Sequence, residues 1–104
     1  MNPERLDHLV LFKLSDALRT GSISDLEFDI AGLMGAARVS RWRLDRDLGL
    51  RPGNPRAFDV ALRAEFADPD EFNRYTGSAA HRRFLDDHVS QRRLTIAAIQ
   101  VRRQ

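Results

Sequence analysis

Tyr75 and His81 stand six residues apart in the stretch DEFNRYTGSAAHRRF, residues 70–84, and their side chains suit proton transfer. An unperturbed imidazole has a pKa of about 6.5, so His81 can act as a general base near neutral pH. A phenol can donate a hydrogen bond to a developing enolate, which suits Tyr75. The pair therefore predicts acid/base chemistry. Packing residues whose polar tips bond the backbone are the alternative interpretation.

A third titratable residue, His8, shares one face of the apolar segment 7–14 with the residues at alternate positions. We expect that face to meet helices, which would bring His8 into one pocket with Tyr75 and His81. A histidine satisfied within the core is the alternative. Small-molecule sites prefer apolar walls, and the expected wall consists of Trp42, Leu44, Phe58, Phe72 and Phe84.

His8, His81 and His88 also raise the question of a metal site. His81 and His88 share a helix face, but seven residues span two turns and a rise of about 10.5 Å. That distance is too long for two ligands of one ion in a regular helix. The absence of cysteine excludes disulfides, thiolate catalysis and cysteine metal sites. We therefore expect no metal and no cofactor.

Size and composition limit the class of protein. The 104 residues predict a single domain over residues 1–104, with 42% apolar residues for its core. Charged residues make up 31%, and no apolar run approaches the ~18 to 20 residues that a bilayer span requires. Glu4 and Asp7 lie where a signal peptide would need a basic start, so we expect a cytoplasmic protein without a membrane segment.

Arginine pairs at 82–83, 92–93 and 102–103 raise the question of nucleic-acid binding. Asp86 and Asp87 lie among these pairs, the net charge is only +2, and no aromatic residue is interleaved as a stacking platform. We therefore expect solvated helix faces with a basic tail, and no nucleic-acid partner.

Four segments have the alternating pattern that predicts β-strands. Residues 57–66 are the clearest, because Phe58, Val60, Leu62, Ala64 and Phe66 alternate with Asp59, Ala61, Arg63 and Glu65. The first segment is apolar on both faces, which is typical of a central strand. The predicted strands are residues 7–14, 39–48, 57–66 and 94–101.

Helical spacing predicts a helix over residues 22–37, with Ser24 and Glu27 as a capping box and Ile23 and Phe28 as a hydrophobic staple. A second helix has a start signal in Asp68, Pro69 and Glu71. Gly77 predicts the end of that helix, and Ser78 can cap a following one. The second helical region is therefore expected to be broken between Tyr75 and His81.

The predicted order β-α-β-β-α-β indicates an α+β ferredoxin-like fold, with a four-stranded antiparallel sheet and helices on one face. The other face would be charged on the second and third strands, and the first and last strands remain apolar on both faces. An open face that is half apolar is expected to be covered by another protein subunit. We therefore expect a homodimer in which two open faces pack together.

Four stretches resemble the stress-responsive A/B barrel (Dabb) domain family, and with the spacing between them they cover nearly the whole chain. They are HLVLFKL at 8–14, RDLGL at 46–50, FDVALRAEF at 58–66 and FNRYTGSAAHRRF at 72–84. The resemblance implies a dimeric α+β barrel built from ferredoxin-like subunits.

The last stretch is the most specific. The family usually has a tyrosine, a short gap and a turn of the His-Pro-Ala-His type, and Tyr75 and His81 stand at the outer positions of that pattern. Ser78 replaces the first histidine and Ala79 replaces the proline. Asp45 also stands where the family often has a glycine.

The resemblance leaves two main hypotheses of function. The first is a small homodimeric binding or stress-associated protein whose pocket between sheet and helices holds an apolar small molecule or nothing. The second is an enzyme similar to the family's plant polyketide cyclase, which uses a Tyr-His pair in an intramolecular aldol condensation. By that resemblance Tyr75 and His81 would be the acid/base pair, with His8 at the start of the first strand. A cofactor-free or haem-dependent monooxygenase rests on fold analogy alone.

Overall fold

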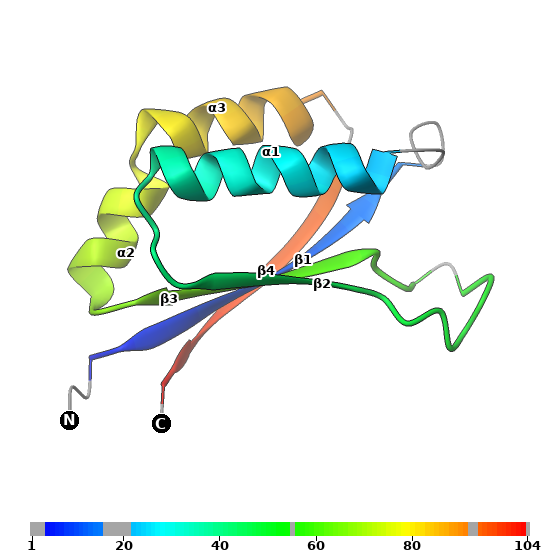
Figure 1. Ribbon diagram of the computed structural model, residues 1–104, viewed down its shortest axis with the longest axis horizontal. Coiled ribbons are helices and arrows are strands. Elements are labelled where there is room, and N and C mark those ends of the chain that lie inside the picture. The colour runs from blue at the N-terminus through cyan, green and yellow to red at the C-terminus, as the bar shows by residue number, and fades with distance from the viewer. Residues whose placement is uncertain (1–3, 16–21, 55, 92–93, 104) are drawn as a thin grey trace.

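The computed structural model describes residues 4–15, 22–54, 56–91 and 94–103, and its elements follow the expected order. Three helices lie on one side of the sheet, as Figure 1 shows. The α+β ferredoxin-like architecture is therefore confirmed, with the second helical region in two pieces. The elements are β1 (Leu6–Leu14), α1 (Ser22–Ala36), β2 (Trp42–Arg46), β3 (Val60–Phe66), α2 (Pro69–Thr76), α3 (Ala79–His88) and β4 (Leu94–Arg102).

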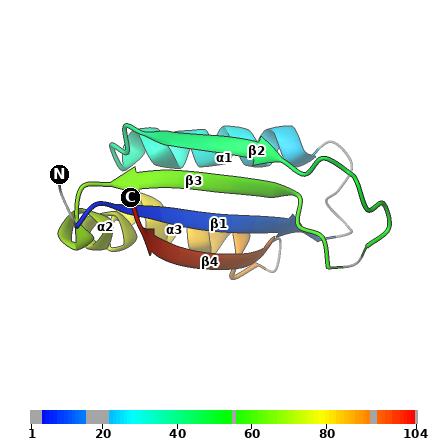
Figure 2. The same cartoon turned by 90° about the horizontal axis from the view of Figure 1, so that it is seen from below.

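The four strands form one antiparallel sheet in the order β2-β3-β1-β4 (Figure 2). β1 is central, as its two apolar faces predict. Ala64 pairs with Trp42 on one side and with His8 on the other, and His8 pairs in turn with Gln100. These four residues therefore form one row across the sheet.

The core lies between the sheet and the helices. Alternate residues of β3 are buried, and Ile30 and Met34 of α1 are fully buried beneath that helix. Burial of this apolar surface is the main favourable term in folding. The buried apolar residues are Val10, Phe12, Leu14, Leu26, Ile30, Leu33, Met34, Val39, Val60, Leu62, Ala64, Phe66, Tyr75, Phe84 and Leu94.

Helix α1 begins at residue 22, as predicted, but the predicted capping box and hydrophobic staple are wrong. The helix begins at Ser22, two residues before Ser24, so Ser24 and Glu27 cannot form a capping box. Both side chains instead bond Arg46 of β2: Nη2 donates to Ser24 Oγ at 3.3 Å and to Glu27 Oε1 at 2.6 Å. The staple is wrong too, because Phe28 is 78% exposed. The residues that resembled a cap therefore tie the helix to an edge strand.

β2 and β3 are shorter than the segments predicted at 39–48 and 57–66. Between them the chain makes tight turns, with Gly49 and Gly53 at φ values of 73° and 78° that favour glycine. Asp59 precedes β3 and accepts a hydrogen bond from the Leu14 backbone amide at 2.8 Å. The turns at Gly49 and Gly53 and the hydrogen bond to Asp59 therefore end the two strands earlier than the apolar pattern predicts.

The face of the sheet opposite the helices, which we call the open face, is divided lengthwise. On β1 and β4 it presents apolar side chains, including Leu11, Ile99 and Val101, which are 42%, 58% and 37% exposed. On β2 and β3 it presents charged side chains, including Arg43 and Arg63. Among the described helices, none is both long enough and apolar enough to span a bilayer.

Helix α1 offers a matched pair of substitutions that tests this packing. Ile30 is fully buried, so Ile30→Ala should lower the free energy of unfolding by about 2–5 kcal/mol. Phe28 is exposed on the same helix, and Phe28→Ala should change it by less than about 0.5 kcal/mol. Urea unfolding followed by circular dichroism measures both. Equal losses in the two variants would contradict the observed orientation of α1.

Candidate functional site

The site begins with helix α2, whose start is fixed by three residues. The Asp68 side chain accepts a hydrogen bond from the Glu71 backbone amide at 2.8 Å, and Pro69 occupies the first helical position. The sequence predicted both the Asp68 cap and the proline at the first helical position. A proline here is pre-organised for the helix and removes no intrahelical bond. The helix then carries Phe72 and Tyr75 toward the sheet, and Tyr75 is 5% exposed.

The Ser78 hydroxyl joins α2 to α3. Its oxygen accepts a hydrogen bond from the His81 backbone amide at 3.2 Å, as an N-cap does. The same hydroxyl donates to the Tyr75 carbonyl at 2.7 Å. One side chain therefore positions the backbone of both proposed acid/base residues. Gly77 allows the turn, because a Cβ atom there would lie 3.2 Å from the Asn73 carbonyl oxygen.

Three polar rings meet beneath this junction. The ring centroids of Tyr75 and His81 are 4.8 Å apart, and those of His8 and Tyr75 are 6.0 Å apart. Phe72 lies 5.0 Å from His8, and Phe66 lies 5.2 Å from Tyr75. The structure thus brings together the three residues predicted for chemistry and packs phenylalanine rings against two of them, His8 and Tyr75. We call Tyr75, His81 and His8 the polar cluster.

Gln100 of β4 also belongs to this site. Its Nε2 lies 2.9 Å from His8 Nδ1, and its backbone pairs with that of His8. A side-chain amide nitrogen is a donor, so this contact assigns Nδ1 as acceptor and leaves the proton on Nε2 of the neutral ring. Gln100 therefore selects one tautomer of His8.

Burial shifts the pKa values of two members of the cluster away from neutrality. Loss of solvent raises the pKa of Tyr75 to about 12. Loss of solvent, and then repulsion from the His81 imidazolium, lowers the pKa of His8 from 6.5 to about 4. Desolvation disfavours the charged form in both cases. At pH 7 the phenol is therefore protonated and His8 is uncharged.

His81 is the half-buried member of the cluster. Burial lowers its pKa below 6.5, and the nearby Thr76 backbone partly opposes that effect. Its Nδ1 atom is buried without a hydrogen-bond partner among the described residues. A lowered pKa leaves His81 neutral at pH 7.

The five residues predicted as an apolar wall do not all reach the cluster. Phe72 does. Leu44 packs against the edge of the core, and Trp42 is 38% exposed on β2, in the same row of the sheet as His8. Phe84 is buried against Phe12 instead, with ring centroids 6.2 Å apart.

Phe58 is also separated from the polar cluster. It precedes β3 at the end of the sheet where Val60 pairs with Phe12, whereas His8 pairs with Ala64 near the other end. There it lines a cavity of about 470 Å³ beside the loop that joins β2 to β3. The alternating pattern placed Phe58 inside a strand, but the strand begins two residues later.

Two neighbours of the cluster escaped the sequence analysis. Phe66 was visible as an inward-facing residue of β3 but was not assigned to the site, although it contacts Tyr75, Phe72 and His8. Gln100 carries no recognisable motif. Only the register of β4 against β1 reveals it, and that register is set by the whole sheet.

His88 lies apart from the cluster. Its Nε2 is 3.2 Å from Asp29 Oδ2, so it links α3 to α1. Within the described residues, no group of three or more His, Cys, Asp or Glu side chains is placed to hold a metal ion. The chemistry available at the polar cluster is hydrogen bonding and proton transfer by neutral groups.

Solved structures share this fold over nearly the whole chain. A dimeric ferredoxin-like protein of unknown function from Thermobifida fusca is 24% identical, with a TM-score of 0.76 over 95% of this chain and 91% of that one. A hydroxynitrile lyase from Passiflora edulis is 18% identical, with a TM-score of 0.75 over 98% and 97%. A Dabb family protein from Mesorhizobium loti is 19% identical, with a TM-score of 0.75 over 96% and 97%.

At these identities the solved structures establish the fold alone. A comparison with curated proteins finds no match. The family model of the stress responsive A/B barrel domain, however, matches residues 6–101, which include every strand and helix except the last residue of β4. The chain therefore belongs to the stress responsive A/B barrel (Dabb) domain family.

Proposed function

We propose that the protein is a homodimer that binds an apolar small molecule bearing a carbonyl or hydroxyl group at the polar cluster. The observation that carries this proposal is the buried Nδ1 of His81, which has no hydrogen-bond partner among the described residues. Leaving a buried polar atom unpaired costs about 1–3 kcal/mol. A ligand oxygen beside the Tyr75 ring would remove that cost.

The surroundings of the cluster favour an apolar ligand. Phe66 and Phe72 pack against its rings, and Phe72 remains half-buried, so part of its surface is available for contact. His81 is half-buried and Gln100 is exposed, so both residues keep surface for contact. Sites for small molecules commonly combine such apolar walls with a few fixed polar groups.

Acid/base catalysis is the second candidate function, and the pairing of a protonated phenol with neutral imidazoles favours it. His81 would remove a proton from the carbon next to a carbonyl group. The Tyr75 hydroxyl would donate a hydrogen bond to the enolate oxygen that forms. In an intramolecular aldol reaction the enolate carbon would attack a second carbonyl of the same molecule. The proton on His81 would then pass to the resulting alkoxide.

Two further observations support the catalytic candidate. The rings of Tyr75 and His81 are in contact, and Ser78 fixes the backbone of both, so the pair is pre-organised. The structurally similar protein from Passiflora edulis is named a hydroxynitrile lyase, so one protein with this fold is an enzyme. His8 would act as a hydrogen-bonding residue, since its low pKa makes it a weak base.

The homodimer would form through the open face of the sheet. Leu11 and Ile99 expose apolar surface there, and contiguous apolar patches on monomers commonly mark interaction sites. The similar protein from Thermobifida fusca is described as dimeric. A two-fold dimer uses the same patch on both subunits, which this strip of β1 and β4 permits.

Ligand binding at the polar cluster predicts a selective loss in one variant. A panel of alkyl and aryl methyl ketones should contain compounds that raise the Tm of the wild-type protein by several degrees at saturating concentration. His81→Ala should abolish that increase, whereas His88→Ala on the same helix should retain it. Differential scanning fluorimetry measures both. The proposal fails if no ketone stabilises the wild type, or if His81→Ala is stabilised equally.

Proton transfer is tested by exchange of the α-protons of the bound ketone in D₂O, followed by NMR. Tyr75→Phe and His81→Ala should each slow exchange by about 10²-fold or more. Because burial lowers the pKa of His81, the base stays neutral to a pH below 6.5. The wild-type rate should therefore be level above pH 6.5 and fall only at lower pH. Binding without exchange would leave the protein as a binding module and refute the catalytic candidate.

Two separate arginine substitutions, one on the open face and one on helix α1, test the dimer interface. Leu11→Arg puts a charge on the open face and should convert the dimer to a monomer, because an unpaired charge at an apolar interface loses its hydration. Phe28→Arg places the same charge on exposed α1 and should leave the mass unchanged. Light scattering during size-exclusion chromatography distinguishes the outcomes. A monomeric Phe28→Arg with a dimeric Leu11→Arg would refute the assignment of the interface.

A further inference from the structure

The helices leave part of β4 uncovered on the same face of the sheet that carries the polar cluster. Burial on this face falls along the strand, from Leu94, which is buried, to Ile96, which is half-buried. The next three residues on the face are all exposed, and we call them the uncovered strip: Ala98, Gln100 and Arg102. The strip adjoins the polar cluster, because Gln100 Nε2 lies 2.9 Å from His8 Nδ1.

Arg102 is the last residue of the uncovered strip. Its backbone pairs with that of Leu6, whereas Gln100 pairs with His8. Alternate residues of a strand share a face, so Arg102 lies on the face of Gln100, about 6–7 Å further along β4. Figure 2 shows this end of β4 at the same end of the sheet as α2, the helix that carries Tyr75.

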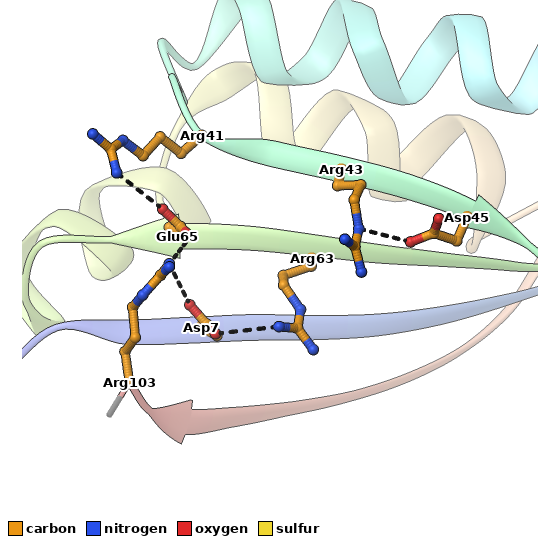
Figure 3. Close-up of polar contacts among 7 residues, drawn as sticks. All are labelled: Asp7, Arg41, Arg43, Asp45, Arg63, Glu65 and Arg103. Atoms are coloured by element: carbon orange, nitrogen blue, oxygen red, sulfur yellow. Dashed lines mark hydrogen bonds and ion pairs between the residues drawn. The ribbon is translucent and has the colours of Figure 1, made fainter.

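The adjacent arginines at 102–103 point to opposite faces and have different surroundings. Arg103 Nη1 is 3.4 Å from Asp7 Oδ1 and is in close contact with Glu65, on the open face (Figure 3). Arg102 is exposed, and no hydrogen bond or ion pair joins it to any other residue that the structure describes. The proposed dimer would cover the open face, so it would bury Arg103 and leave Arg102 accessible.

The surroundings of Arg102 on the helix face are uncharged. Between Leu6 and Val10, β1 presents only these two residues and His8 to that face, and β4 presents the uncovered strip beside them. Burial lowers the pKa of His8 to about 4, so its ring is uncharged at pH 7. A ligand that extends from the polar cluster along the strip therefore meets a single positive charge, at the far end.

We infer that the ligand of the polar cluster is a keto acid, an apolar carbonyl compound whose carboxylate binds Arg102. The inference rests on the function proposed above and narrows its class of ligand. The carbonyl oxygen would lie beside Tyr75 and His81, and the apolar chain would follow the uncovered strip. The carboxylate would accept two parallel hydrogen bonds from the guanidinium group of Arg102.

Charge and geometry favour a carboxylate over a phosphate ester at this end of the ligand. A phosphate monoester carries a charge of about −1.5 to −2 at pH 7, which is more than one guanidinium group neutralises. A carboxylate carries one negative charge and matches the planar fork of a single arginine. Gln100 adds no charge, although the second N–H of its amide is available as a further donor.

Matched pairs of compounds separate this inference from the proposal on which it rests. One member is a straight-chain methyl ketone of about six to ten carbons, and the other has a carboxylate in place of the terminal methyl group. Isothermal titration calorimetry at low salt should show that the wild type binds the keto acid about fivefold more tightly than the ketone. The preference should shrink at about 0.5 M NaCl, because salt screens an exposed ion pair.

Three arginine variants assign the preference to one side chain. Arg102→Gln should remove it and leave the Kd of the neutral ketone unchanged. Arg102→Glu should reverse it, so that the ketone binds more tightly than the keto acid. Arg83→Gln makes the same change of charge beside the hollow between α1 and α3, and should retain the wild-type preference. Circular dichroism confirms that each variant is folded.

The possible failures are distinguishable. If the ketones bind but the keto acids bind no more tightly, or if Arg102→Gln keeps the preference, the inference is refuted and the proposed function stands. If binding of the keto acid requires Arg102 but survives His81→Ala, the arginine is a separate surface site for anions, which also refutes the inference. If neither compound binds the wild type, the inference and the proposed function both fail.

Discussion

The structure depends on one constraint, which is that the helices cover a single face of a four-stranded sheet. Successive residues of a strand point to opposite faces, so each strand must meet two different environments. On β1, Val10 and Phe12 are buried under the helices while Leu11 between them is 42% exposed. The helix face can therefore enclose a desolvated site, whereas the open face leaves apolar side chains of β1 and β4 exposed on the surface of the subunit.

In the polar cluster, burial of the same side chains both contributes to the core and sets their protonation states. The aromatic packing that buries Tyr75 and His8 also removes the water that would stabilise their charged forms. The result is a protonated phenol beside neutral imidazoles. The Ser78 hydroxyl bonds both helices at their junction, so the relative position of Tyr75 and His81 depends on a backbone turn rather than on contacts with a ligand.

Local signals predicted much of this arrangement, and long-range pairing supplied the rest. The caps at Asp68 and Ser78 and the inward face of β1 follow from residue type and spacing, and the structure confirms them. Ser24 and Glu27 have the spacing of a capping box but bind Arg46, 19 or more residues away, which no local pattern reveals. Gln100 reaches His8 only because β4 pairs with β1 in one register.

The central claim is that the two faces of the sheet have separate roles, with a ligand under the helices and a second subunit on the open face. Sedimentation equilibrium of the wild-type protein at micromolar concentration tests it most directly, because a covered open face requires two chains. The account predicts a mass of about 24 kDa, twice the 11.9 kDa of one chain. A mass of one chain across that concentration range would contradict it.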